Sequence, residues 1–487
     1  MPTQEEAGKL EIGKSTLHYF WTEYTTILTI AVNMSDNSKR KSQTKLIQAE
    51  KRSAFRKSKP NLNCFRVQSI RAREILDSRG HPTIEVDVMT EGGVLGRADA
   101  PAGRSKGTYE AVEMRDRTER YHGLGVQKAV GVVNRVVAPL LKGIDVREQR
   151  EIDHVLIERD GTENKSKIGG NVITATSWAV AKAAANALTL PIYRYIGGSN
   201  AHILPVPMFL YVCGGKLAAT DFDFQEFDVM PIGARNFAEA MRMGSEVYHT
   251  LGEMLAKKYG RYSLNTGDEG SFSPPGPSDP REAFDIILKA IEEEGYQKHF
   301  ILALDAAATH LYDARRKKYT YMGKKITREK LMEVYEELAE TYPLRSIEDA
   351  FYEDDFEGFA EITRKLNIQI VGDDFFVSNV KRLLKGIKMG AANTVLLKVN
   401  QIGTLTEALD TASCAIKNGY GVLVSERSAQ TEDTWLADLT VGINSGQIKN
   451  GAPVRSERVA QFNQLLRIEE ELGKSATYAG RNFRRPL

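Results

Sequence analysis

The sequence predicts an α/β protein in which an N-terminal α+β domain is followed by a βα barrel. The length of 487 residues allows more than one domain, and 42% hydrophobic with 27% charged residues is an ordinary composition for a folded protein. Strand patterns precede helical patterns in residues 66–200, whereas residues 201–487 repeat a strand followed by a helix. We therefore expect one domain in each of these ranges, after a basic extension over residues 1–65.

The N-terminal domain is predicted from a change of periodicity. Residues 81–99 alternate between apolar and polar side chains on both sides of a Gly-Gly turn, which predicts two strands. Residues 125–141 and the alanine-rich stretch 172–188 place apolar residues at helical spacing. Strands followed by helices are typical of a compact α+β unit, which we expect to end near Asn200.

The barrel is predicted from short apolar runs that each lead into an amphipathic helix. Buried strands that show no alternation and that each feed a helix indicate a parallel sheet. The runs span residues 301–305, 345–348, 368–373, 394–398 and 421–425, and helices are expected at 328–341, 356–366, 378–388 and 404–418. From the second run on, the strand ends recur about every 25 residues, which favours a closed barrel over a half-sheet.

Five polar residues end the predicted barrel strands: Asp305, Glu348, Asp373, Lys398 and Ser425. The C-terminal strand ends of a βα barrel carry its active site, so these side chains are expected to meet at one rim. Three converging carboxylates repel one another strongly unless a cation lies among them, and hard oxygen ligands suit Mg²⁺. The alternative for any single acid is a cap on the following helix.

Lys398 is the candidate general base. A buried lysine beside metal cations has a lowered pKa, and a neutral amine can remove a proton α to a carboxylate. The alternative is that Lys398 only pairs with the acids. Further candidates are two acids, Glu226 and Glu269, and a set able to hold a phosphate or carboxylate, Arg427, Ser428 and Lys449. The alternative for this last set is a solvated barrel rim.

Charge and cysteine content exclude other classes. A net charge of +2 offers no electrostatic case for nucleic-acid binding. Three widely spaced cysteines, Cys64, Cys213 and Cys414, indicate neither a zinc site nor a disulfide framework and are typical of a reducing compartment. Residues 1–65 carry a net charge of +5, and the run 19–32 is too short and too polar to span a bilayer. We interpret residues 1–65 as a disordered basic extension; an organellar transit segment or a tail for anionic surfaces is the alternative.

The ordered motifs of residues 66–480 resemble those of the enolase family. They are R-E-I-L-D-S-R-G-H-P-T at 73–83, D-G-T-E-N-K-S-K at 160–167, Q-E-F at 225–227, G-D-E-G at 267–270, S-I-E-D at 346–349, G-D-D at 372–374, L-L-K-V-N-Q-I-G at 396–403, R-S at 427–428, T-E-D at 431–433 and G-Q-I-K at 446–449. The resemblance implies an enolase-type barrel that dehydrates 2-phosphoglycerate to phosphoenolpyruvate with Mg²⁺. It also implies a cytoplasmic homodimer, or an octamer as in some members.

The same resemblance implies a role for each matching residue. The first Mg²⁺ would be bound by Asp305, Glu348 and Asp373, and the second by Ser105 on a mobile loop. Lys398 would take the C2 proton, and Glu269, with Glu226 as its neighbour, would help to expel the C3 hydroxyl. The substrate-binding residues implied are Glu226, Glu348, Asp373, Arg427, Ser428 and Lys449, with Arg427 and Ser428 matching the phosphate-binding pair.

Two family histidines are absent from the expected site. The second mobile loop carries Leu217 in place of one, and Glu426 replaces the other. Leucine donates no hydrogen bond, and a carboxylate repels phosphate unless it is paired. Loss of one donor aimed at developing charge costs about 10²–10³ in rate, so we expect weaker turnover than in members with both histidines.

The first loop also departs from the family, since Arg104 and Lys106 add two cations beside Ser105. They could bind a differently placed anion or only add surface charge. Three functions remain: an enolase with an altered substrate shell, a homologue acting on another multiply anionic carboxylate such as a phosphonate-pathway substrate, or a catalytically weak binding protein. The retained base, acid and metal ligands favour an enzyme. We expect a small phosphorylated carboxylate as substrate, a homo-oligomer, and neither nucleic-acid binding nor a membrane span.

Overall fold

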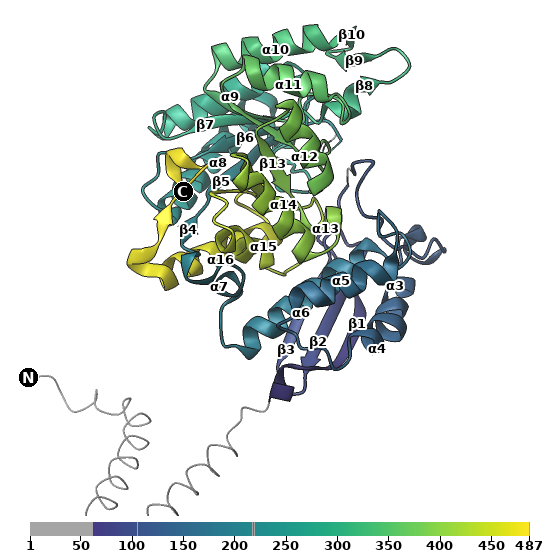
Figure 1. The fold of residues 1–487 in the computed structure, drawn as a ribbon. Coiled ribbons are helices and arrows are strands. Elements are labelled where there is room, and N and C mark those ends of the chain that lie inside the picture. Colours follow the sequence, from purple (N-terminus) through teal and green to yellow (C-terminus); the bar gives the residue numbers. More distant parts are fainter. Residues whose placement is uncertain (1–61, 105, 217, 219, 487) are drawn as a thin grey trace, which may run out of the picture. The chain divides into compact units, whose positions relative to one another are not determined.

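The structure, a computed structural model, describes residues 62–486 except 105, 217 and 219. Most of the expected basic extension over residues 1–65 therefore lies outside the described residues. The residues from Asn63 to Leu487 form one compact unit (Figure 1). No helix in the described part of the chain is long and apolar enough to cross a membrane.

The N-terminal domain is an antiparallel three-stranded sheet covered by helices. The strands β1 (Val67–Leu76), β2 (Pro82–Thr90) and β3 (Leu95–Asp99) pair in the order β1-β2-β3. The helices are α3 (Gln127–Val132), α4 (Ala138–Leu141), α5 (Gln149–Asp160) and α6 (Gly170–Ala187), followed by the short α7 (Ile192–Gly197). The alanine-rich α6 lies directly on β3, where a Cβ at Gly96 would approach the carbonyl oxygen of Ala179 to 2.1 Å. Only glycine at this position allows so close an approach.

The predicted helix over 125–141 is interrupted in the structure. A turn of π-helix at Val133–Val137 separates α3 from α4, and Pro139 stands in the first turn of α4. Because proline lacks an N–H, it cannot continue the regular hydrogen-bond ladder of the preceding turn. The two strands expected over 81–99 correspond to β2 and β3, and β1 was not predicted.

The second domain is a closed eight-stranded barrel, which confirms the predicted fold class. In spatial order the strands are β11 (Leu344–Glu348), β12 (Gln369–Gly372), β13 (Thr394–Leu397), β14 (Gly421–Ser425), β15 (Gln447–Lys449), β5 (Val206–Cys213), β6 (Glu226–Met230) and β7 (Ile301–Asp305). The larger helices around them are α8 (Phe237–Tyr259), α9 (Pro280–Glu293), α10 (Arg328–Thr341), α11 (Phe356–Lys365), α12 (Val380–Met389), α14 (Leu405–Lys417), α15 (Trp435–Gly442) and α16 (Ser456–Leu472) (Figure 1).

Smaller elements complete the second domain. They are β4 (Ile203–Leu204) paired with β16 (Thr477–Tyr478), the outer hairpin strands β8 (Tyr312–Asp313), β9 (Lys318–Tyr321) and β10 (Lys324–Ile326), and the single turn α13 (Val399–Ile402). Helix α13 contacts α6, and α14 contacts α5, so the N-terminal domain packs on this side of the barrel.

One strand departs from the expected parallel arrangement. β6 runs antiparallel to both neighbours, with Glu226 opposite Cys213 of β5 and opposite Asp305 of β7. The chain reverses between β5 and β6, and such a reversal gives antiparallel pairing, whereas a parallel neighbour needs a crossover. The five predicted strands lie within one or two residues of β7, β11, β12, β13 and β14, and these strands pair in parallel.

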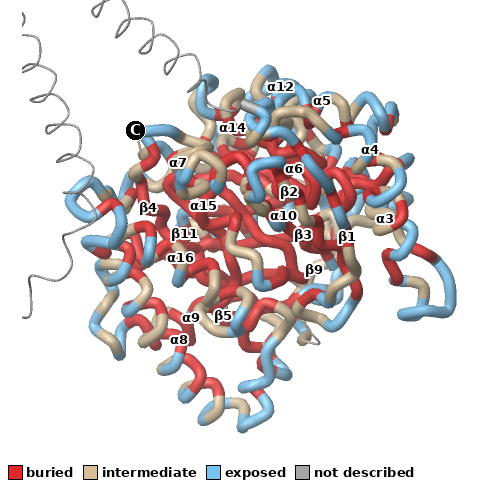
Figure 2. Tube along the Cα trace, turned by 90° about the horizontal axis from the view of Figure 1, so that it is seen from below, coloured by how far each residue is buried: buried red, intermediate tan, exposed pale blue. Residues whose placement is uncertain are grey.

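Buried residues are concentrated in the centre of the molecule (Figure 2), and those inside the barrel form a cluster separate from the one that packs against the helices. The interior cluster contains alternate strand residues, namely Val206, Met208, Met230, Ile301, Ala303, Val371, Leu396 and Leu423. Because a strand repeats every two residues, the residue two positions further on faces the same interior. This places the polar residues at the strand ends inside the mouth of the barrel.

Candidate active site

The period of the strands explains why the predicted residues converge. Ala303, Val371, Leu396 and Leu423 face the interior, so Asp305, Asp373, Lys398 and Ser425, two residues on, face the same space one layer higher. A cavity at this rim is lined by Gly103, Gln225, Glu226, Glu269, Asp305, Asp373, Lys398, Ser425, Glu426, Arg427, Ser428 and Lys449. Glu348 touches this set through Lys449, whereas Ser105 and Leu217 lie outside the described residues.

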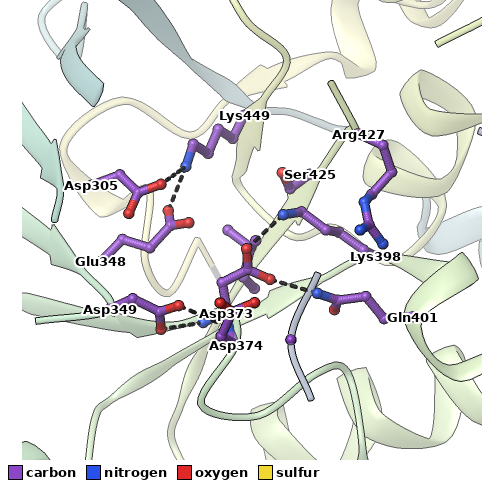
Figure 3. Close-up of polar contacts among 12 residues, drawn as sticks. Asp305, Glu348, Asp349, Asp373, Asp374, Lys398, Gln401, Ser425, Arg427 and Lys449 are labelled. Carbon is purple, nitrogen blue, oxygen red and sulfur yellow. Dashed lines mark hydrogen bonds and ion pairs between the residues drawn. The ribbon is translucent and has the colours of Figure 1, made fainter. Parts of the chain in front are cut away.

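Lys449 is surrounded by carboxylates. Its Nζ lies 2.8 Å from Oε2 of Glu348 and 3.2 Å from Oδ2 of Asp305 (Figure 3). It also lies 3.1 Å from Oε2 of Glu226. Burial acts to lower the pKa of Lys449, but the neighbouring carboxylates outweigh it and hold the pKa well above its usual value. Burial raises the pKa values of Glu226 and Glu348 well above their usual range, and the ammonium group opposes this. The positive charge that the acids require is therefore supplied in part by Lys449.

Lys398 and Asp373 form a second buried pair. Nζ of Lys398 donates to Oδ2 of Asp373 at 2.6 Å, and Gln401 Nε2 donates to Oδ1 at 2.7 Å (Figure 3). Burial acts to lower the pKa of Lys398, but Asp373 and Glu348 together outweigh it, so the net pKa is raised. Burial acts to raise the pKa of Asp373, but the neighbouring cations, Lys398 first among them, outweigh it and lower the pKa. The sequence predicts a lowered pKa for Lys398 beside metal cations; among the protein's own groups, the nearest charge is the carboxylate of Asp373, which raises the pKa.

The carboxylates fit a hard divalent cation. Asp305, Glu348 and Asp373 offer oxygen atoms, the donor type that Mg²⁺ prefers. Oε1 of Glu348 is buried and has no hydrogen-bond partner among the described residues, so this oxygen is available to a cation. Burial and the nearby Asp305 both favour the protonated form of Glu348, and a cation would reverse that preference.

Two acids next to this set were missed by the sequence reasoning. Asp349 and Asp374 follow Glu348 and Asp373 directly, and carboxylate oxygens of Asp349, Asp373 and Asp374 lie within 4.8 Å of one another. Asp349 accepts hydrogen bonds from the backbone N–H groups of Asp373 at 2.9 Å and of Asp374 at 2.8 Å. Asp349 therefore stabilises the turn after β12. The adjacent acids in the motifs S-I-E-D and G-D-D were the sequence signal that could have identified Asp349 and Asp374.

Arg427 lies on the opposite side of Lys398 from Lys449 (Figure 3). Its Nη1 donates to Oε2 of Glu110 at 2.8 Å and its Nη2 to Oε1 at 3.2 Å, which is a two-pronged contact. Glu110 belongs to the N-terminal domain and was also missed, because it lies in a loop without a recognisable pattern. Ser428 Oγ, beside Arg427, accepts a hydrogen bond from the backbone N–H of Arg104 at 2.8 Å.

Glu426, the residue in place of a family histidine, is paired. Its carboxylate contacts the guanidinium of Arg458, and the two side chains are 3% and 0% exposed. Arg458 also donates to the carbonyl oxygens of Arg427 at 2.9 Å and Ser428 at 2.6 Å. Burial lowers the pKa of Arg458 to about 10. Because its carboxylate is paired with Arg458, Glu426 need not repel a phosphate.

The two added cations of the first loop are also paired with acids. Nη1 of Arg104 lies 3.0 Å from Oδ2 of Asp268, the residue before Glu269, and Nζ of Lys106 lies 3.0 Å from Oε2 of Glu113. Both cationic side chains are about half exposed. These ion pairs favour the interpretation that Arg104 and Lys106 add surface charge over the interpretation that they bind a second anion.

The fold and the cavity together define a class of enzyme. A barrel that places a buried lysine, a cluster of carboxylates fit for a divalent cation, a further acid and an arginine around one cavity is typical of enzymes that remove a proton next to a carboxylate.

Comparison with known proteins identifies the family. The model "Enolase, N-terminal domain" matches residues 67–196, and "Enolase, C-terminal TIM barrel domain" matches residues 201–487. The chain is 55% identical over 424 residues to a protein named Enolase from Methanocaldococcus jannaschii, covering 87% of this chain and 99% of that protein. It is 56% identical over 427 residues to Enolase from Pyrococcus furiosus, with the same coverage. The chain belongs to the enolase family, as the motifs predicted.

Proposed function

We propose that this protein dehydrates 2-phosphoglycerate to phosphoenolpyruvate, with Lys398 as the base and Glu269 as the acid. The observation that carries the proposal is the arrangement of Lys398, Glu269 and Arg427 around one cavity, in a chain 55% identical to a protein named Enolase. Two alternatives, another multiply anionic substrate or a binding role, have less support. Lys398, Glu269 and Arg427 are all present around the cavity, and Glu426 is paired with Arg458.

Mg²⁺ is the proposed cofactor. Asp305, Glu348 and Asp373 would hold it, and Ser105 is the proposed ligand of a second ion. The bound cation supplies positive charge against the second negative charge that builds up on the substrate carboxylate when the C2 proton leaves.

Proton transfer in this proposal begins at Lys398. Its Nζ must be neutral to accept the C2 proton, whereas pairing with Asp373 keeps its pKa raised. With Asp373 engaged as a ligand of a bound cation, that stabilisation would weaken and burial would lower the pKa of Lys398. Glu269 then gives a proton to the C3 hydroxyl, the C3–O bond breaks, and water leaves as the C2–C3 double bond forms.

Binding groups sit on two sides of the base. Arg427 and Ser428 are proposed to hold the phosphate, and Lys449 the substrate carboxylate. Both cations are buried, so each charge–charge contact with the substrate is made away from bulk water. Asp305, Glu226 and Glu348 keep Lys449 charged, since they raise its pKa against the effect of burial.

A homodimer in the cytoplasm is proposed for the intact protein. The homodimer rests on membership of the enolase family, in which it is usual. All three cysteines are free thiols, which is typical of proteins in a reducing compartment.

The test is a phosphoenolpyruvate assay with the purified full chain, 2-phosphoglycerate and Mg²⁺. We expect product from the wild type and a loss of at least about 10²-fold in kcat for Lys398→Ala. Lys388→Ala, an exposed lysine on α12, is the matched control and should retain wild-type activity. Equal rates for the wild type and Lys398→Ala would end the proposed role of Lys398, and no product from the wild type would end the proposed reaction.

A further inference from the structure

We propose that Glu110, a residue of the N-terminal domain, is the positioning residue for Arg427 and so completes an anion site that the barrel alone does not build. This inference rests on the proposed function, in which Arg427 binds the phosphate of the substrate. Glu110 itself does not need to touch the substrate. It acts by setting the plane and direction of the arginine side chain.

The contact between the two residues is close and shielded. The side chains of Arg427 and Glu110 are 4% and 6% exposed, and both Nη atoms of Arg427 donate to separate oxygens of Glu110. A two-pronged contact of this kind fixes the guanidinium plane, which a single hydrogen bond does not. Nη1 also donates to Oδ1 of Asn400 at 3.2 Å, which adds a third point of attachment.

Glu110 is in turn held in place from both domains. Its Oε1 accepts from the backbone N–H of Gly107 at 3.1 Å, which belongs to its own loop, and from Nε2 of Gln401 at 3.4 Å, which belongs to the barrel. The N–H of Ala111, the next residue, donates to the carbonyl oxygen of Gln401 at 2.7 Å. The carboxylate therefore has little freedom to follow Arg427 if that side chain moves.

The other end of the loop is tied to the barrel as well. Thr108 donates through its backbone N–H to Glu353 at 3.1 Å and its hydroxyl contacts the same carboxylate. The hydroxyl of Tyr109 donates to Asp354 at 2.9 Å, and the guanidinium of Arg382 lies over the Tyr109 ring. These contacts fix residues 108–111 on the barrel and so hold Glu110 at a defined position relative to Arg427.

Competition for Arg427 explains why a positioning residue is needed. Asp373 and Glu113 also act on Arg427, and all three acids raise the arginine pKa against the effect of burial. Without Glu110, the guanidinium would lose the two-pronged contact that fixes its plane and could turn toward these other acids and away from the phosphate. We therefore expect Glu110 to affect substrate binding more than the chemical step.

The test is a double-mutant cycle on the full chain with Glu110→Gln and Arg427→Gln. For Glu110→Gln we expect KM for 2-phosphoglycerate to rise about tenfold while kcat changes less than about threefold. The dissociation constant of inorganic phosphate, measured by calorimetry with Mg²⁺ present, should rise by about the same factor. In the Arg427→Gln background, the Glu110→Gln exchange should change KM by less than about threefold, because the guanidinium that Glu110 positions is no longer present.

Controls separate the possible outcomes. Glu91→Gln, an exposed residue of the same domain, should leave KM unchanged. Circular dichroism checks folding, and Glu110→Asp replaces Glu110→Gln in the same cycle if the latter does not fold. Additive effects in the cycle, or an unchanged KM, would overturn the positioning role. If the wild type forms no phosphoenolpyruvate yet phosphate binding still follows the expected cycle, the proposed reaction fails while the positioning role stands.

Discussion

Glu426 and Arg458 form a buried ion pair next to the residues proposed to bind phosphate. Arg458 comes from α16 and donates to the backbone carbonyl groups of Arg427 and Ser428, so the same guanidinium holds both the acid and the loop. The charge of Arg458 offsets that of Glu426 inside the protein. Compensation of the Glu426 charge does not supply the hydrogen-bond donor that a histidine would offer. We therefore still expect lower turnover than in members with both histidines.

Removing the Glu426 charge should destabilise the protein. Glu426→Gln leaves Arg458 buried without its main carboxylate, and breaking a buried pair by removing one partner costs about 3–5 kcal/mol. We expect the free energy of unfolding, from urea denaturation, to fall by that amount. Glu432→Gln, an exposed acid nearby, is the control and should change it by less than about 0.5 kcal/mol. An unchanged stability for Glu426→Gln would mean that the pair is not formed.

Glu269→Gln should separate the two chemical steps. The amide cannot donate the proton that the C3 hydroxyl needs, so phosphoenolpyruvate formation should fall about 10²–10⁴-fold. Lys398 is untouched, and exchange of the C2 hydrogen with deuterated solvent should continue, as followed by proton NMR of 2-phosphoglycerate. Parallel loss of exchange and dehydration would place Glu269 in the first step instead.

Mg²⁺ should stabilise the folded chain, because the three carboxylates meet only in the native state. At a free concentration one hundred times the dissociation constant, ligand linkage adds about 2.7 kcal/mol to the free energy of unfolding. We expect a rise in Tm that EDTA reverses and that Asp305→Asn reduces. A melting temperature insensitive to millimolar Mg²⁺ would contradict the assignment of these ligands.

Asp438 should make stability depend on pH. Burial raises the pKa of Asp438 to about 7, above the usual value of about 3.9 in an unfolded chain. Between these values the native state holds a proton that the unfolded state has lost, so stability falls as pH rises toward the folded pKa and levels off above it. Asp438→Asn lacks this term, and its advantage over the wild type should grow by about 1.4 kcal/mol from pH 6 to pH 8.

Urea denaturation at several pH values measures this difference. Glu91→Gln, which is exposed, should follow the wild type at every pH. If the difference between Asp438→Asn and the wild type does not change with pH, Asp438 does not carry a native-state proton in this range.

Much of the barrel could be predicted because its strands are short apolar runs that end in a polar residue. Asp305, Glu348, Lys398 and Ser425 were placed at the rim from this pattern, and the structure brings them there. β6 was missed, since this short buried strand follows β5 without a helix between the two, which breaks the strand-then-helix unit. Arg458 was missed for a different reason: a charged residue on an amphipathic helix looks solvent-exposed until its neighbours are known.

The sequence by itself determined the fold class, the family and the chemical types gathered at the rim, because these depend on local periodicity and on short contiguous motifs. The tertiary structure decided which charge faces which: Lys398 against Asp373, Lys449 among three acids, Glu426 against Arg458, and Arg427 against Glu110 from the other domain. Pairings of this kind join residues up to 317 positions apart. They set the pKa values through distance and burial, which no local pattern encodes.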